Sequence, residues 1–189
     1  ECSFGPLMKI LGETDKRKYN DIDEIRQIIW EGYRDLVNDE NNLDRILEIL
    51  RDKQGKTELL KGVDDTEKFE TAIINNDYFM TTLDLYVVAQ KRGLSVILFP
   101  NKNTDNKLDD IGFVRGDWLI LGLHSNKSSD NKFYFVRSNK KFTPSRMLDR
   151  SYSVKELNDM TDMIQSAMQG GDYRDHMISI ANFLSQTDK

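Results

Sequence analysis

The sequence contains few of the residues on which several classes of protein depend. It has one cysteine, two histidines and three prolines among 189 residues. A single cysteine excludes an internal disulfide framework and a zinc site built from several thiolates, and it fits a reducing compartment. No run approaches the roughly 18 apolar residues that span a bilayer, and no signal-peptide pattern opens the chain. We therefore expect an intracellular, cytoplasmic protein with no membrane or metal partner.

The chain also lacks an excess of positive charge. Lys and Arg number 27 against 32 for Asp and Glu, which gives a net charge of −5. A protein of this charge has no general basic face for phosphates, so we expect no nucleic-acid partner. Neither a glycine-rich phosphate loop nor an EF-hand loop is present, so we expect no cofactor.

What remains is a mixed-charge chain with 38% hydrophobic residues, enough for one domain or slightly more. Because it begins at Glu1, we expect a piece of a larger protein. Asp occurs 22 times and Glu 10 times, a usage compatible with an AT-rich genome such as that of a large DNA virus or a protist. If the source is viral, the expected location is the host cytoplasm.

Apolar spacing at three and four residues predicts that the first half of the chain is mostly helical. Capping residues and breakers set the expected ends, with Asp21 or Thr81 before a helix and Gly12 or Gly93 after one. The predicted helices cover residues 4–12, 21–37, 43–50, 66–74 and 82–92.

Short apolar runs then predict strands at 95–99, 118–123 and 132–137. We expect the first to be central, and the last two to pair as an antiparallel hairpin with an eight-residue loop. After Pro144 we expect no strand, and two helices over 153–170 and 172–184. These assignments give two regions: a core over 1–143 and a helical pair over 144–189, which either packs on the core or forms an interaction arm.

Cys2 is the only thiol that could act as a nucleophile. At the start of a helix, the backbone N–H groups and the helix dipole favour the thiolate. The alternative is that Cys2 is a small buried hydrophobe. As the base we favour His124, which ends a predicted strand, over His176, whose neighbours Asp172 and Asp175 indicate a solvated face.

The order of these elements resembles the ovarian-tumour (OTU) family of papain-like cysteine proteases. Cys2-Ser3-Phe4 is similar to the second half of that family's nucleophile motif. The run from Leu83 to Ala89, followed by the strand from Val96 to Phe99, is similar to its Leu-Glu-Leu helix and buried strand. The resemblance implies a cysteine protease fold with ubiquitin or a ubiquitin-like protein as the partner.

The sequence departs from the family at the base. Lys132 stands where the family has its histidine, and a lysine with an ordinary pKa near 10.4 stays protonated at neutral pH. If the hairpin pairs Leu123 with Lys132, His124 lies opposite Asn131, with Cα atoms about 4.5–5.5 Å apart. Asn131 or Asn126 could then orient His124, unless His124 is a loop residue without a partner.

We therefore predict an α+β fold: an OTU-like papain-type core with helices packed on a small mixed sheet, plus the C-terminal helical pair. The predicted function is a protein-recognition or scaffolding module with a degenerate active site, that is, a pseudoenzyme. Its predicted binding residues are Tyr78, Phe79, Phe133 and Phe135. Such a module would expose an apolar patch, either on the helix carrying Met160, Ile164 and Met168 or around Phe133 and Phe135. Two alternatives remain: an active deubiquitinating isopeptidase that uses Cys2, His124 and Asn131, and an unrelated α+β domain.

Overall fold

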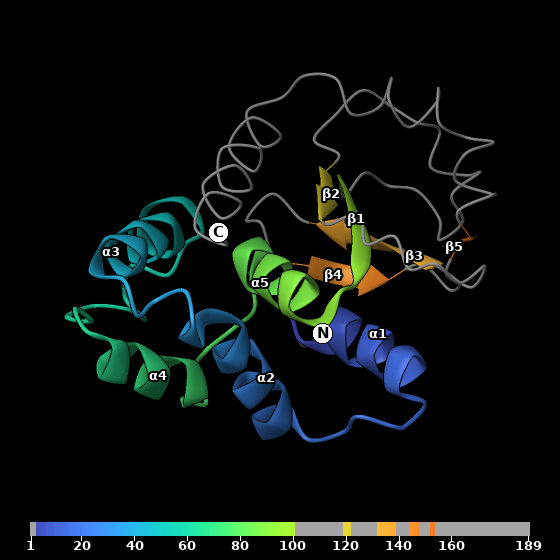
Figure 1. The fold of residues 1–189 in the computed structure, drawn as a ribbon, viewed down its shortest axis with the longest axis horizontal. Helices are drawn as coiled ribbons and strands as arrows, with labels where there is room; N and C mark the ends of the chain where they lie inside the picture. The colour runs from blue at the N-terminus through green and yellow to red at the C-terminus, as the bar shows by residue number, and fades with distance from the viewer. Residues whose placement is uncertain (1–2, 101–118, 122–131, 139–143, 148–151, 154–189) are drawn as a thin grey trace.

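Helices fill the chain from Gly5 to Arg92, and strands follow (Figure 1). The structure is a computed structural model that describes residues 3–100, 119–121, 132–138, 144–147 and 152–153. The helical elements are α1 (Gly5–Asp15), α2 (Ile22–Arg34), α3 (Glu40–Glu48), the π-helix η1 (Ile49–Lys53), α4 (Thr66–Ile74) and α5 (Thr82–Arg92). The strands are β1 (Ser95–Pro100), β2 (Leu119–Leu121), β3 (Lys132–Ser138), β4 (Pro144–Met147) and β5 (Tyr152–Ser153).

Side-chain caps explain where most of these helices begin. Asp21, Asp39 and Asp65 each accept a backbone N–H from the first turn of α2, α3 and α4. Thr81 and Asp84 form a capping box at the start of α5. Gly93 ends α5 with a φ of 66°, a conformation that side chains with a Cβ rarely adopt. The five helices predicted before Gly93 are confirmed, with ends displaced by a few residues.

The core lies between helices, with α5 at its centre. Every residue from Thr82 to Ala89 is buried, so α5 is covered all round. It packs on α2 at Gly32, where an added Cβ would lie 3.0 Å from Val87 Cγ2. The rings of Trp30 and Tyr33, also in α2, meet Phe69 of α4 edge to face. The close approach at Gly32 therefore sets the spacing of α2 and α5.

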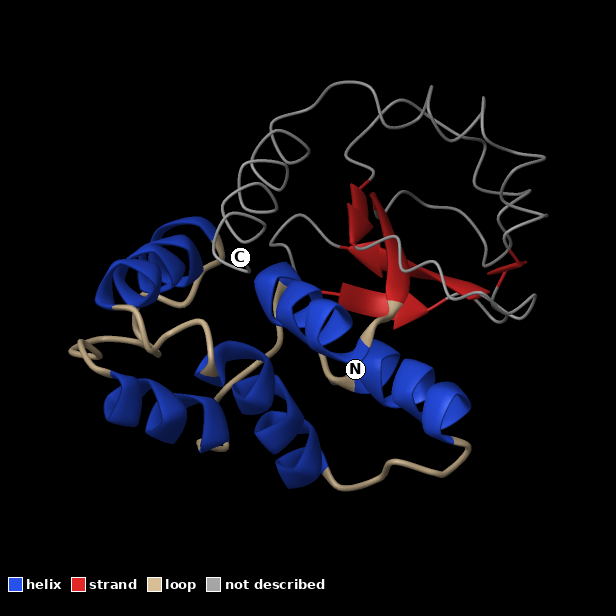
Figure 2. Ribbon diagram, in the orientation of Figure 1, coloured by secondary structure: helices blue, strands red, loops and turns tan. Residues whose placement is uncertain are grey.

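The strands lie to one side of the helices, as Figure 2 shows. They run in the order β2-β1-β3-β4, and β5 also pairs with β3. β1 is antiparallel to β2, with Val96 opposite Leu121, and parallel to β3, with Ser95 opposite Phe133. β1 is therefore an internal strand, as the sequence predicted.

The predicted hairpin is wrong. β1 lies between β2 and β3, so residues 119–121 and 132–138 are not neighbours in the sheet. The prediction that no strand follows Pro144 is also wrong, because β4 begins at that residue and β5 at Tyr152. The short distance in sequence between the two strands favoured a hairpin. The apolar β1 is instead better buried, and forms more backbone hydrogen bonds, when it pairs on both edges.

The predicted fold class is wrong as well. The part of the chain that the structure describes is predominantly helical, which does not fit an α+β, OTU-like papain-type core with helices packed on a mixed sheet. Of the 32 buried hydrophobic side chains described, all but Val96, Tyr134 and Val136 lie at or before Leu94. Helices packed against one another thus supply most of the described core. Residues 144–147 and 152–153 of the predicted helical region are strands, and residues 154–189, which hold the rest of the predicted helical pair, lie outside the described residues.

Candidate functional site

A closed cluster of polar side chains joins four segments of the helical core. The Lys56 ammonium is paired with Asp84 Oδ2, and both side chains are 0% exposed. The hydroxyls of Tyr33 and Tyr78 each donate to Asp84 Oδ1 at 2.6 Å. Lys56 Nζ also donates to the Tyr78 hydroxyl at 2.8 Å. We call these four residues the Lys56 cluster.

Burial and charge together set the protonation of the Lys56 cluster. Burial lowers the pKa of Lys56 from 10.5 to about 8, and the Asp84 carboxylate opposes part of that shift. Burial, and then the charge of Asp84, raise the pKa of Tyr33 and of Tyr78 well above the ordinary value. At neutral pH Lys56 therefore keeps its proton, and both phenols are neutral.

The start of α5 completes the hydrogen bonding around Asp84. The Thr81 backbone N–H donates to Asp84 Oδ2 at 2.8 Å. Gln54 Oε1 accepts from the Thr81 hydroxyl at 2.7 Å and from the Leu83 backbone N–H at 3.2 Å. Since its members are buried and bonded to one another, the Lys56 cluster holds the fold and offers no opening to a substrate.

The segment that leads into α5 carries a partly exposed aromatic ring beside the start of α1. Tyr78 is 2% exposed and Met80 is 0% exposed, but Phe79 between them is only partly buried. The Met80 backbone N–H donates to Ser3 Oγ at 2.8 Å, across 77 positions of sequence. We call Ser3, Phe4 and residues 78–80 the Phe79 junction.

Arg26 of α2 borders the Phe79 junction. Its guanidinium carbon lies 5.5 Å from the centre of the Phe4 ring, and its Nη2 donates to the Asn76 carbonyl at 3.2 Å. Its Nη1 pairs with Asp23 at 2.6 Å. Among the described side chains, only Arg26 Nε is a buried polar atom without a hydrogen bond. Arg26 thus ties the start of α1 to the loop before Phe79.

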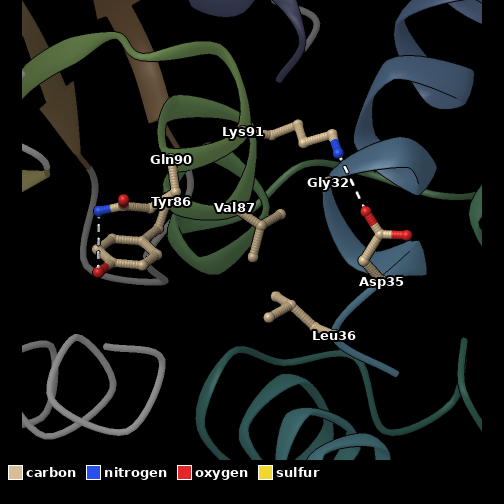
Figure 3. A pocket seen from close by; sticks show the side chains of 7 residues that line it. All are labelled: Gly32, Asp35, Leu36, Tyr86, Val87, Gln90 and Lys91. Atoms are coloured by element: carbon tan, nitrogen blue, oxygen red, sulfur yellow. Dashed lines mark hydrogen bonds and ion pairs between the residues drawn. The ribbon is translucent and has the colours of Figure 1, made fainter. Parts of the chain in front are cut away.

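A pocket of about 220 Å³ opens between the C-terminal ends of α2 and α5 (Figure 3). In that view Leu36 and Val87 lie between the Lys91–Asp35 ion pair on one side and Tyr86 with Gln90 on the other. A pocket for a drug-sized ligand usually exceeds about 300 Å³. This pocket is therefore smaller than a typical site for a drug-sized ligand.

A second hollow, of about 350 Å³, is lined mainly by acidic residues. Four carboxylates line it together with Arg51, Leu47 and Val63. Arg51 is occupied, since Nε donates to the Leu60 carbonyl and Nη2 to the Val63 carbonyl. The carboxylates belong to Asp44, Glu48, Asp52 and Asp64. Nothing in the described residues indicates what would bind there.

The structure describes only part of the predicted site. Cys2, His124, Asn126, Asn131, Met160, Ile164 and Met168 lie outside the described residues. Because β2 and β3 do not pair, the register that placed His124 opposite Asn131 is absent. Lys132, which stands where the family has its histidine, begins β3 opposite Ser153.

The predicted binding residues fall in two places. Phe133 and Phe135 lie on β3, opposite Ser95 and Ile97 of β1. Tyr78 and Phe79 lie in the Phe79 junction, but Tyr78 is buried with its hydroxyl bonded to Asp84, so Phe79 is the one of this pair left to contact a partner.

Sequence reasoning missed Lys56, Asp84, Tyr33 and Arg26. Lys56 follows Gly55 in a polar stretch that interrupts a helix, a pattern typical of a solvated loop. The only available signal was the spacing of Thr81 and Asp84, which indicates a capping box but not an ion pair.

Comparisons with known proteins give no relative. No family model, no curated protein and no solved structure matches the chain. The resemblance to the OTU family stays a prediction. In the part of the chain that the structure describes, no three His, Cys, Asp or Glu side chains form a group that could hold a metal ion. Among the described helices, none has the length and apolar character needed to cross a membrane.

Proposed function

We propose that this protein is a protein-recognition or scaffolding module that contacts its partner through the Phe79 junction. The observation that carries the proposal is a partly exposed aromatic ring held between two buried neighbours. Aromatic side chains dominate the binding energy of many interfaces, and a ring fixed before binding loses less conformational entropy.

Contacts on both sides hold Phe79 in place. Tyr78 is bonded to Asp84 and Lys56, and the Met80 backbone is bonded to Ser3. The chain at residues 78 and 80 therefore cannot move without breaking these buried and partly buried hydrogen bonds. A partner would meet this ring in one fixed position.

Ubiquitin or a ubiquitin-like protein is the first partner to test, on the strength of the OTU resemblance. The single cysteine supports a reducing location, which we place in the cytoplasm, or in the host cytoplasm for a viral protein. The net charge of −5 argues against nucleic acid as the partner.

The test is an NMR titration of 15N-labelled ubiquitin with the unlabelled chain. We expect ubiquitin signals to shift with the wild type, and Phe79→Ala to weaken binding by about tenfold, or about 1.4 kcal/mol. Leu36→Ala is the matched control, because Leu36 is also a partly buried apolar residue but lies near the opposite end of α5. Unchanged ubiquitin signals, or equal binding by the Phe79→Ala protein, would contradict the proposal.

A second candidate is a deubiquitinating cysteine isopeptidase that uses Cys2. The hydrogen bond between Ser3 and Met80 favours it, because the bond places the residue after Cys2 beside Phe79 at the start of α1. In this proposal Cys2 is the nucleophile and His124 the base, oriented by Asn131.

Ubiquitin carrying a thiol-reactive C-terminal electrophile tests this candidate. An enzyme forms a covalent adduct that Cys2→Ala abolishes and that forms more slowly with His124→Ala. An adduct formed equally by the Cys2→Ala protein would contradict it, as would no adduct from folded wild type. Binding without an adduct supports the recognition module instead.

A further inference from the structure

We propose that the charge on Lys56 fixes the position of Phe79, so that protonation of this buried amine regulates the Phe79 junction. The regulatory part of this inference rests on the proposed function. The coupling between Lys56 and Phe79 rests on the geometry of the Lys56 cluster alone.

The geometry joins Lys56 directly to the partly exposed Phe79 ring. Its Nζ lies 4.0 Å from the centre of the Tyr78 ring and 5.4 Å from the centre of the Phe79 ring. Both distances fall within the roughly 6 Å over which an ammonium is attracted to an aromatic face. Lys56 is also bonded to the Tyr78 hydroxyl, so it holds the backbone next to Phe79 as well.

The titratable groups around this amine come from three segments. Asp84 of α5 pairs with it, Tyr78 of the segment before α5 accepts from it, and Tyr33 of α2 donates to the same carboxylate. Both tyrosines stay neutral until the pH exceeds their ordinary range, because burial raises the pKa of each. Among these groups, Lys56 is therefore the one whose charge changes first as the pH rises above neutral.

Loss of the Lys56 proton is expected to change the position of the Phe79 side chain while the hydrogen bonds that hold the fold remain. Without Lys56, Asp84 still accepts from the Tyr33 and Tyr78 hydroxyls and from the Thr81 backbone N–H. The carboxylate therefore stays hydrogen-bonded, as a buried charge requires. The attraction between the ammonium and the two rings disappears, because a neutral amine lacks the charge on which it depends. Burial lowers the pKa of Lys56 to about 8, which places the change close to physiological pH.

The experiment measures the environment of the Phe79 ring directly. 4-Fluorophenylalanine is placed at position 79, and its 19F signal is followed between about pH 6.5 and 9.5. We expect one titration step with a midpoint of about 8. A constant chemical shift across this range would overturn the inference, and that result needs no variant.

Two variants test whether Lys56 causes the titration step. Lys56→Met/Asp84→Asn removes both buried charges, so neither is left unpaired, and we expect the step to disappear. Lys53→Met removes an exposed lysine of η1, and we expect the step to remain. A step that persists in the double variant, or that disappears with Lys53→Met, would contradict the role of Lys56.

Ubiquitin binding tests the regulation separately. We expect wild-type affinity to be about threefold lower at pH 9 than at pH 7, and the double variant to show no such change. A 19F step without any ubiquitin binding would refute the proposed function and keep the coupling. Binding to ubiquitin without a 19F step would refute the coupling and keep the proposed function.

Discussion

Lys56 and Asp84 form a completely buried ion pair between residues 28 positions apart in the sequence. The pair joins the segment after η1 to the first turn of α5. The Lys56 ammonium needs the Asp84 carboxylate, because an ion in the protein interior loses its hydration. The arrangement of the helices around α5 therefore depends on both residues.

The first prediction concerns the removal of one of these charges. Asp84→Asn leaves the Lys56 ammonium buried without its counterion, so we expect the free energy of unfolding to fall by about 3–5 kcal/mol. Asp35→Asn is the control, since the Asp35–Lys91 pair spans 3.1 Å on the surface. Its expected cost is below about 1 kcal/mol. Urea unfolding measures both, and similar losses for the two variants would contradict the importance of burial.

The second prediction concerns the pH dependence of stability. Below about pH 8 Lys56 is charged in both the folded and the unfolded chain. Between about pH 8 and 10.5 the unfolded chain binds a proton that the folded chain has lost, so the free energy of unfolding rises with pH. The slope from this residue is at most about 1.4 kcal/mol per pH unit.

Tyr33 and Tyr78 have the opposite effect on the free energy of unfolding as the pH rises. Because the pKa of Tyr33 and of Tyr78 is raised by folding, stability falls as the pH rises above the ordinary value of 10.0. Urea unfolding at several pH values measures both parts, with Lys56→Met/Asp84→Asn as the comparison. A wild-type slope between pH 8 and 10 that the double variant shares would rule out Lys56 as its source.

The third prediction tests the close approach of α2 and α5. An alanine Cβ at position 32 would lie 3.0 Å from Val87 Cγ2 and 3.2 Å from the Val87 carbonyl carbon. We expect Gly32→Ala to lower the unfolding free energy by about 1–3 kcal/mol, because the helices must separate. Gly5→Ala is the matched change in a helix, since nothing lies within 4 Å of its added Cβ. Thermal unfolding should show Gly5→Ala at or above wild-type stability.

The fourth prediction concerns the bond between Ser3 and Met80. Ser3→Ala removes the acceptor of the Met80 N–H, so we expect a loss of about 0.5–1.5 kcal/mol. Hydrogen exchange should show faster exchange at the Met80 amide while the amides of α5 keep their protection. Thr71→Ala, which removes a hydroxyl bonded to the Glu67 carbonyl on the exposed face of α4, serves as the control. Unchanged exchange at Met80 would mean that the bond does not hold the Phe79 junction.

Local signals in the sequence predicted the helices well. The Thr81–Asp84 capping box and Gly93 set both ends of α5, and apolar spacing located α2 and α4. These features act within one helix, so they can be recognised without knowledge of the rest of the fold.

Long-range pairing could not be predicted in the same way. Nothing near Lys56 indicates that Asp84 lies beside it, because the pair forms only when α5 packs into the core. The predicted sheet order was wrong for a similar reason: β2 and β3 are neighbours in the sequence, but both pair with β1. For the same reason the sequence offered no sign of the contact between Ser3 and Met80.

The position of β1 within the sheet has a consequence for synthesis on the ribosome. Ser95 pairs with Phe133, so β1 gains its parallel neighbour only after some 40 further residues have been translated. The helices before Leu94 precede all the strands that the structure describes, and they can pack while those residues are still being made. Until β2 and β3 emerge, β1 carries two open edges, and this interval is when a nascent chain is most exposed to aggregation.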